Sequence, residues 1–429
     1  MKANQFGTLS ETPKAIEMEH RASDTAVDSA VETQEGHQVL AVHSACSEAR
    51  RFTHAVWIVV LASALLCANA GPCSGAASAR WKPEIGTPQW WDTDGRGVNP
   101  SRIILLYNSG SMPAWTSNRL RYYIAHIKPD GAPDAWFFDT VLILALTAES
   151  QRGFEPNHGN GPATAEDWRH YLDQRLFGGL SELAELEKAV QETGTQLGDR
   201  RRTVRVVIGI PYPDPRATAF GRLDDQPLDL SREEDRAAAV RWYVRQVSRR
   251  WTAGHFERLR LAGFYWVREE VPDQDQALLK QASRLVANQL LPFYWIPYFG
   301  SEGSNRWREL GFDIAIQQPN YFFYEVPPER IEEAATFARQ HFMGIEMEMD
   351  RRVISSEEKR ERYRRYLEGG VETGYLHSGV LAWYDDTALL ECGRSQETSI
   401  RKVYDDTYRF VIGQYRKDEA RPMALPPTQ

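Results

Sequence analysis

Two pairs of acidic residues are placed where they could do chemistry. Residues 342–350 read Phe-Met-Gly-Ile-Glu-Met-Glu-Met-Asp, in which apolar and polar side chains alternate. This alternation puts Glu346 and Glu348 on one face of a strand and the apolar side chains on the other. A second pair, Glu269 and Glu270, follows the apolar run 261–267. Carboxyl groups turned into a protein are costly unless they are paired or used, so both pairs are candidate catalytic groups.

Paired carboxyl groups suit the hydrolysis of glycosidic bonds. One carboxylic acid protonates the leaving oxygen, and a second carboxylate attacks the sugar or activates a water molecule. We assign Glu269 as the acid/base, with Glu270 as the alternative, and Glu348 or Glu346 as the nucleophile or base. Two simpler interpretations stay open, namely a solvated acidic strand and salt bridges with the neighbouring Arg268 or Arg351.

The segments that must position these acids alternate between short apolar runs and helical stretches. The helix that follows the third apolar run, 204–210, is expected to begin with Ser231 as its N-cap residue and to end near Arg250. Alternation of this kind specifies a parallel sheet, and eight units predict a closed (β/α)8 TIM-type barrel. An open doubly wound sheet is disfavoured, because no glycine-rich phosphate loop follows the first run. The eight expected strands are 102–107, 139–146, 204–210, 261–267, 292–296, 312–316, 342–350 and 379–383.

In such a barrel the active site lies at the carboxyl ends of the strands. The amides and aromatic rings found there suit the binding of sugar hydroxyls and sugar faces. Alternate rings must pack against the helices, however, and Pro319-Asn320 is also an ordinary turn sequence. The second strand adds Asp139 at its start, or inside the barrel if the strand begins earlier. The other expected substrate-binding residues are Asn108, Tyr212, Tyr265, Trp295, Tyr298, Gln318, Asn320, Tyr321 and Tyr384.

Other chemistries lack their residues. The histidines show no metal-ligand spacing, so we expect no metal and no cofactor. No serine nucleophile motif is present. The net charge of −8 gives no electrostatic support for nucleic-acid binding. The cysteines have no CxxC spacing, although Cys73 and Cys392 could form a disulfide if both survive processing.

The N-terminal region has the composition of a leader followed by an export signal. Residues 1–54 are polar and are expected to be disordered. Residues 55–79 contain a short apolar run after Arg50-Arg51 and then small residues, as in a signal peptide, although 55–71 could instead anchor the chain in a membrane. We therefore expect a secreted, periplasmic or cell-envelope protein with the barrel at 80–417 and a loose tail at 418–429. The oligomeric state is not predicted.

The positions of the acids resemble those of the large glycosidase superfamily whose acid/base follows strand four and whose nucleophile ends strand seven. This chain departs from that superfamily because Arg268, and not Asn, precedes Glu269. The order of motifs over roughly 102–415 resembles a bacterial family catalogued as domain of unknown function 4855. The matching motifs are Ile210-Pro211-Tyr212-Pro213, Gly263-Phe264-Tyr265-Trp266 with Glu269, Trp295-Ile296-Pro297-Tyr298, Gly311-Phe312-Asp313, Gln318-Pro319-Asn320-Tyr321 and Gly344-Ile345-Glu346-Met347-Glu348.

That resemblance implies a secreted or surface barrel of glycosidase type and names no substrate. The sequence therefore predicts an exported glycoside hydrolase that acts on a polysaccharide or oligosaccharide. The alternative is a non-catalytic carbohydrate-binding or cell-envelope barrel that uses the same aromatic groove.

Overall fold

The computed structural model describes residues 101–110, 112–179 and 181–417. The predicted leader, the signal or anchor segment and the C-terminal tail lie outside these residues. Cys73 also lies outside them, and its suggested partner Cys392 is a buried free thiol. None of the helices in the described part of the chain combines the length and hydropathy that a membrane crossing requires.

Eight parallel strands close into a barrel, as predicted. Each strand pairs with its neighbours in parallel, and β1 closes the ring by pairing with both β4 and β12. The strand order around the ring is β1, β12, β11, β10, β9, β8, β5, β4. The barrel strands are β1 (Ser101–Tyr107), β4 (Thr140–Leu144), β5 (Val204–Ile210), β8 (Leu259–Trp266), β9 (Phe293–Trp295), β10 (Ile314–Gln317), β11 (Gly344–Glu348) and β12 (Val380–Tyr384).

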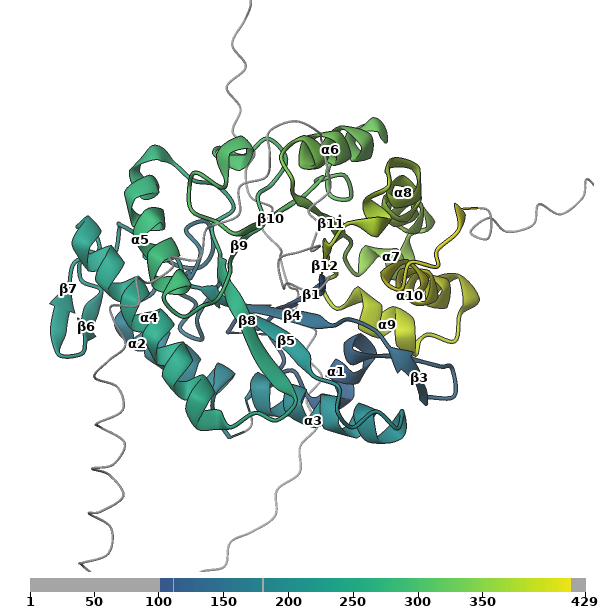
Figure 1. The fold of residues 1–429 in the computed structure, drawn as a ribbon, viewed down its shortest axis with the longest axis horizontal. Helices are drawn as coiled ribbons and strands as arrows, with labels where there is room; N and C mark the ends of the chain where they lie inside the picture. Colours follow the sequence, from purple (N-terminus) through teal and green to yellow (C-terminus); the bar gives the residue numbers. More distant parts are fainter. Residues whose placement is uncertain (1–100, 111, 180, 418–429) are drawn as a thin grey trace, which may run out of the picture. The chain divides into compact units, whose positions relative to one another are not determined.

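Helices lie around the outside of this ring of strands (Figure 1). Two short antiparallel hairpins, β2 (Ala125–Ile127) with β3 (Pro133–Trp136) and β6 (Gly221–Leu223) with β7 (Gln226–Leu228), add to the loops. The main helices are α1 (Ser117–Ile124), α2 (Ala165–His170), α3 (Glu182–Gln196), α4 (Glu233–Gly254), α5 (Gln276–Ala287), α6 (Glu329–Gln340), α7 (Arg352–Ser355), α8 (Glu357–Thr373), α9 (Ala388–Arg394) and α10 (Thr398–Val411). Shorter helical turns are η1 (Tyr171–Leu176), η2 (Asp273–Asp275), η3 (Ser304–Arg306) and η4 (Tyr375–His377).

Several predicted boundaries differ from the structure, and two of the differences have a clear physical cause. Helix α4 begins at Glu233 with Arg232 as its N-cap residue. The Ser231 hydroxyl cannot cap it, because that hydroxyl donates to the Asp229 carboxylate at 2.7 Å in a local turn. The seventh barrel strand begins only at Gly344, because Phe342 adopts a left-handed φ of 57° that is incompatible with a strand.

Strand β11 is buried on both faces. Its apolar residues Ile345 and Met347 belong to the hydrophobic core, and both are fully buried. Glu346 and Glu348, on the opposite face, are only 3% and 2% exposed. The interpretation of this stretch as a solvated acidic strand is therefore wrong, and its two carboxyl groups lie inside the protein.

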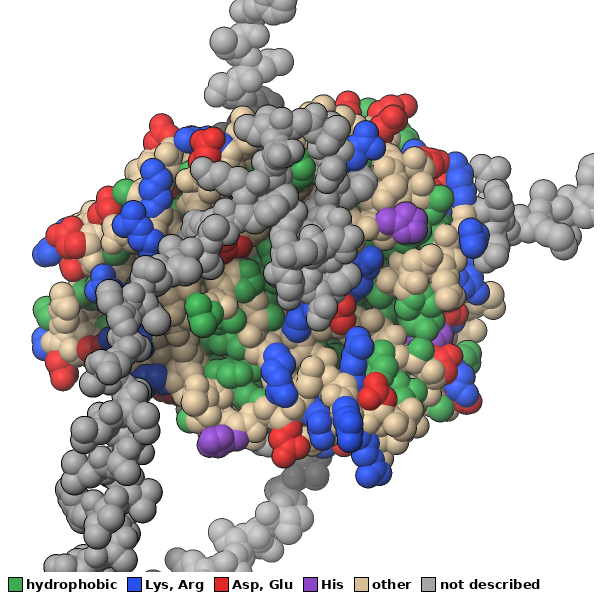
Figure 2. All heavy atoms as spheres, viewed as in Figure 1, with side chains coloured by type: hydrophobic (Ala, Val, Ile, Leu, Met, Phe, Trp, Pro, Cys, Tyr) green, Lys and Arg blue, Asp and Glu red, His purple; other side chains and the backbone are tan. Residues whose placement is uncertain are grey.

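The charged surface of the described residues is mixed. On the face shown in Figure 2, basic and acidic side chains lie beside one another around the rim. Several basic side chains gather along its lower edge, with acidic ones next to them. This pattern differs from the continuous basic stripe by which nucleic-acid-binding domains are recognised.

A buried ion-pair network fixes the carboxyl ends of β5 and β8 to the helices outside them. Asp275 is fully buried and accepts hydrogen bonds from Arg236 at 2.8 Å and from the Tyr212 hydroxyl at 2.8 Å. Arg268 donates to the same Tyr212 hydroxyl at 2.6 Å. Since Glu269 follows Arg268 in the chain, this network sets the path of the backbone that carries the predicted acid/base.

We expect Asp275→Ala to lower the free energy of unfolding by about 3–5 kcal/mol, because the Arg236 guanidinium would be left buried without its partner. The matched control is Asp273→Ala on the same helical turn, whose side chain is 86% exposed and which should cost about 1 kcal/mol or less. Urea denaturation measures both changes. Equal, small effects of the two substitutions would show that the network does not hold this end of the barrel.

Candidate active site

The carboxyl group of Glu348 ends β11 and is held by three hydrogen bonds. Its Oε2 atom accepts from the backbone N–H of Asn320 at 2.6 Å and from the Tyr366 hydroxyl at 2.6 Å. Its Oε1 atom accepts from the Asn320 side-chain amide at 3.3 Å. Burial raises the pKa of Glu348 to about 7, although these donors favour the ionised form.

Glu269 lies on the loop after β8 and is only partly exposed. Burial raises its pKa to about 7, and the neighbouring Glu155 carboxylate raises it further. The Gln318 side chain hydrogen-bonds to Glu269 and His158 lies near it, and both lower the pKa. Each of the two carboxyl groups therefore changes protonation state near neutral pH.

Glu346 lies one inward-facing position deeper on β11 than Glu348. Its Oε1 atom is buried and has no hydrogen-bond partner among the described residues. Burial, then the charge of Glu348 and then that of Glu269 raise the pKa of Glu346 well above its ordinary value, which favours its protonated form. Glu269 also raises the pKa of Glu348, so the three carboxyl groups share one electrostatic environment.

Tyrosine rings line the barrel interior beside Glu346. Tyr107 and Tyr384 meet edge to face, with ring centroids 5.3 Å apart. Glu346 contributes to the raised pKa of both of these phenols and of Tyr265. Tyr265 and Tyr384 therefore lie near Glu346, and their predicted role in sugar binding stays a prediction.

The loop after β10 joins the two acids. The Asn320 amide donates to both Glu348 and the Gln318 side-chain oxygen, the latter at 3.1 Å. Asn320 adopts a left-handed φ of 53°, which Asn tolerates better than most residues. The predicted Gln318 and Asn320 are therefore both part of the site, although they hold the acids through hydrogen bonds. The predicted Tyr321 lies beside them, with its ring centroid 5.8 Å from that of Tyr366.

Glu270 differs from its neighbour Glu269. Its side chain is 37% exposed and forms an ion pair with Arg268 at 2.7 Å. The Tyr298 hydroxyl donates to it at 3.1 Å. The structure therefore assigns the rim salt bridge to Glu270 and places the predicted Tyr298 against this rim carboxylate, with Glu269 also close enough to raise the Tyr298 pKa.

Three predicted sugar-binding residues lie elsewhere. Asp139 directly precedes β4, at the amino ends of the strands, where it pairs with Arg205 at 2.7 Å. Trp295 is fully buried, its indole N–H donates to the Arg268 carbonyl at 2.8 Å, and its ring stacks on Phe312. Tyr212 is held in the Asp275 network. These placements correct the sequence-based expectation, because the three side chains already serve packing or ion pairing away from the acids.

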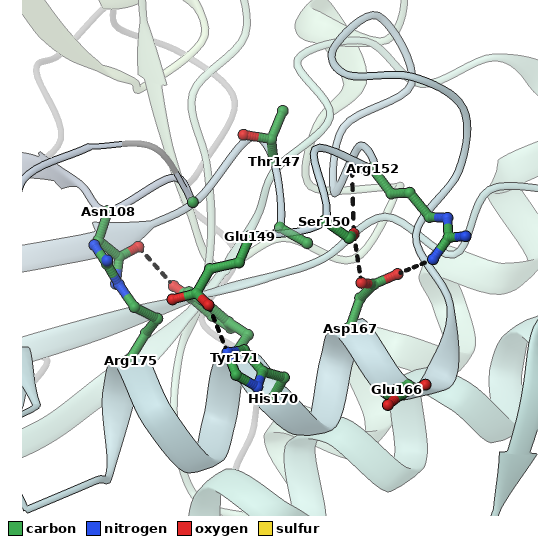
Figure 3. A pocket seen from close by; sticks show the side chains of 12 residues that line it. Asn108, Thr147, Glu149, Ser150, Arg152, Glu166, Asp167, His170, Tyr171 and Arg175 are labelled. Atoms are coloured by element: carbon green, nitrogen blue, oxygen red, sulfur yellow. Dashed lines mark hydrogen bonds and ion pairs between the residues drawn. The ribbon is translucent and has the colours of Figure 1, made fainter.

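Asn108 lies at the carboxyl end of β1, as predicted, and lines a hollow of about 270 Å³. The hollow lies between the loops after β1 and β4 and the segment of α2 and η1 (Figure 3). The side chains of Glu269, Glu346 and Glu348 do not line this hollow.

Sequence reasoning missed three residues of the site. Tyr366 comes from the charged helix α8, and nothing in the sequence of that helix distinguishes it. Glu155 and His158 come from the long loop after β4, where the His158 ring nitrogen Nδ1 and a Glu155 carboxylate oxygen lie 2.6 Å apart. The length of that loop was the only available signal, because long loops in compact domains often carry function.

The site has the parts of an acid/base pair. Among the described residues, no group of three or more His, Cys, Asp or Glu side chains is placed to hold a metal ion. A carboxylate that accepts three hydrogen bonds can act as a nucleophile or base. A carboxyl group whose pKa is raised to about 7 can deliver a proton at neutral pH.

A family model described as a domain of unknown function (DUF4855) matches residues 102–409. No curated protein sequence matches the chain. Among solved structures, a mutant tryptophan synthase alpha-subunit from the hyperthermophile Pyrococcus furiosus is 11% identical with a TM-score of 0.35, covering 73% of this chain and 98% of its own. The BexX/CysO complex from Amycolatopsis orientalis gives 10% identity and a TM-score of 0.35, covering 79% of this chain and 99% of that one. Likenesses at this level carry no argument about function.

We expect Glu346→Gln to change the pH dependence of stability. The pKa of Glu346 is higher in the folded protein than its ordinary 4.5, so its contribution to stability is complete below pH 4.5 and is lost as the pH rises above that value. The glutamine variant lacks this loss. Its stability relative to the parent should therefore increase by up to about 1.4 kcal/mol per pH unit as the pH rises from 4.5 toward the raised pKa of the folded protein.

Thermal denaturation at several pH values measures this difference. Glu332→Gln, an exposed glutamate on α6, serves as the control and should give a flat difference. A flat difference for Glu346→Gln as well would contradict the assignment of a buried, protonated carboxyl group.

Proposed function

The chain belongs to the DUF4855 family, and we propose that its barrel is a glycoside hydrolase that cleaves a polysaccharide or oligosaccharide. The observation that carries this proposal is the electrostatic coupling of Glu269 and Glu348. These two carboxyl groups come from non-adjacent strands, and each has a pKa of about 7. Pairs of carboxyl groups with perturbed pKa values at the carboxyl end of a barrel are the usual machinery of glycosidases.

The surroundings support different roles for the two acids. Glu348 accepts hydrogen bonds from Asn320 and Tyr366, which fix its orientation and favour its ionised form, so we assign it as the nucleophile or base. Glu269 has fewer donors and the neighbouring Glu155 charge, which favour its protonated form, so we assign it as the acid. Burial favours the protonated form of Glu346, and in that form its carboxyl group can donate a hydrogen bond to a sugar hydroxyl.

The proposed substrate fits the predicted export of the chain. Residues 55–79 have the features of a signal peptide or an anchor, which would deliver the barrel to the cell envelope or to the medium. Polysaccharides are abundant there. The proposal requires no cofactor.

We expect Glu269→Gln and Glu348→Gln each to lower hydrolysis by about 10²–10⁴-fold, because each removes a proton donor or a carboxylate from the reaction. The substrate is first found by screening the purified protein against plant and bacterial glycans. The rate is then measured for each variant, with melting temperatures to confirm folding. Glu270→Gln is the matched control, since it changes the neighbouring residue and should retain most of the activity.

Unchanged hydrolysis in both Glu269→Gln and Glu348→Gln would exclude these acids from catalysis. Glycan binding without hydrolysis by the parent protein would instead support the alternative of a non-catalytic carbohydrate-binding or cell-envelope barrel.

A further inference from the structure

The hollow beside Asn108 holds buried hydrogen-bonding groups that lack partners. Asn108 is 1% exposed, and the Tyr171 hydroxyl donates to its side-chain oxygen at 2.9 Å. Its amide nitrogen Nδ2 is buried and has no hydrogen bond of normal geometry among the described residues, although the Glu182 carboxyl group lies near it. The Nε atom of Arg175, which also lines the hollow, is likewise without such a bond. The acceptor nearest to both is the buried Glu182 carboxyl group, which lies 3.0 Å from the Arg175 guanidinium, so this end of the hollow is a cluster of polar groups that a ligand hydroxyl could join.

The basic side chains around the hollow are paired with carboxylates of the protein, and Glu166 adds one more carboxylate to the lining. Glu149 pairs with His170 at 2.8 Å, and both side chains are 46% exposed. Asp167 pairs with Arg152 at 3.6 Å. At the other end, Arg175 pairs with Glu182 at 3.0 Å. Among the described residues, both arginines that line the hollow, Arg152 and Arg175, are thus engaged with carboxylates, so the lining suits an uncharged ligand better than a phosphate or a carboxylate.

Figure 3 shows how these groups are arranged along the hollow. Asn108 and Arg175 lie at one end, Glu149 and His170 lie in the middle, and the pair of Asp167 with Arg152 lies at the other end. A ligand that bridges this length needs hydroxyl groups, which donate to the Glu149 carboxylate and accept from the Asn108 amide. The ring of a neutral sugar has such hydroxyl groups on several sides.

The hollow flanks the proposed catalytic acids. It opens over the carboxyl ends of β1 and β4, which are neighbours in the barrel. Strand β12 separates β1 from the strand of Glu348, and β5 separates β4 from β8, after which Glu269 follows. Tyr107, the chain neighbour of Asn108, is close enough to Glu269 and Glu346 for their charges to raise its pKa. One polysaccharide chain can therefore reach both places.

We propose that this hollow is a subsite for a neutral sugar unit remote from the bond that is cleaved. The inference rests on the proposed function and extends it, because it makes the substrate an oligosaccharide or polysaccharide of several uncharged units. Binding energy from a remote unit raises the rate of reaction only for substrates long enough to fill the subsite.

Glu149→Ala tests the subsite, since Glu149 is half exposed and its loss should leave the fold intact. Binding is measured by calorimetry in a Glu348→Gln background, so that the ligand is not consumed. The probes are neutral glucan, xylan and mannan oligosaccharides of increasing length, together with a uronic-acid series. The control is Glu192→Ala, an exposed glutamate on α3.

We expect Glu149→Ala to weaken the binding of the longer neutral oligosaccharides by about tenfold or more. In the protein that retains Glu348, the Glu149→Ala substitution should lower kcat/KM for long substrates. It should leave kcat/KM for the shortest cleaved substrate unchanged. Equal binding with and without Glu149 would overturn the subsite and leave the hydrolase proposal standing. If the protein hydrolyses none of the glycans but its oligosaccharide binding depends on Glu149, the hydrolase proposal is overturned and the sugar-binding site is supported. A dependence on Glu149 for uronic-acid oligosaccharides alone would overturn the neutral-sugar assignment.

Discussion

The cost of ionising three carboxyl groups in one buried region governs the candidate site. Glu346 and Glu348 are almost fully buried on β11, and the loop after β8 brings Glu269 into their electrostatic range. Water cannot fully solvate these groups, so only the available hydrogen bonds decide which of them ionises. Glu348 has three such bonds, whereas the Oε1 atom of Glu346 has none among the described residues. Three residues of the same type can therefore hold different protonation states.

The barrel supplies the rigid support that this arrangement requires. The closed ring fixes the ends of β8 and β11, and the buried network around Asp275 fixes the backbone before Glu269. The loop after β10 then spans the gap, because Asn320 in its left-handed conformation presents both its backbone N–H and its amide to Glu348. Strained backbone of this kind persists where surrounding contacts over-determine it, and it is common at functional sites.

The barrel could be predicted from the sequence because eight apolar runs alternate with helical segments. Each of these segments is recognised from its own residues, without knowledge of tertiary contacts. The sequence also predicted which end of the barrel holds the acids, and the period of two along β11 placed Glu346 and Glu348 on the inner face. It did not predict that Tyr212 joins the Asp275 network or that Trp295 packs on Phe312, because alternation along a short aromatic strand does not say which of its two faces is the inner one. Tyr366 and Glu155 were missed for a different reason, since their contacts with Glu348 and Glu269 are tertiary and leave no local pattern. Asp139 was correctly expected at the start of its strand, but the start of a barrel strand lies at the end opposite the acids, so its assignment to substrate binding was wrong.

The central claim is that buried glutamates of this barrel hold protons near neutral pH. The most direct test is a pH titration of the side-chain carboxyl carbons by ¹³C NMR in protein labelled at glutamate. The account predicts that Glu269 and Glu348 titrate near pH 7 and that Glu346 titrates well above its ordinary value, with one of these three signals lost in each of Glu269→Gln, Glu346→Gln and Glu348→Gln. Titration of every glutamate near its ordinary value of about 4.3 would contradict it.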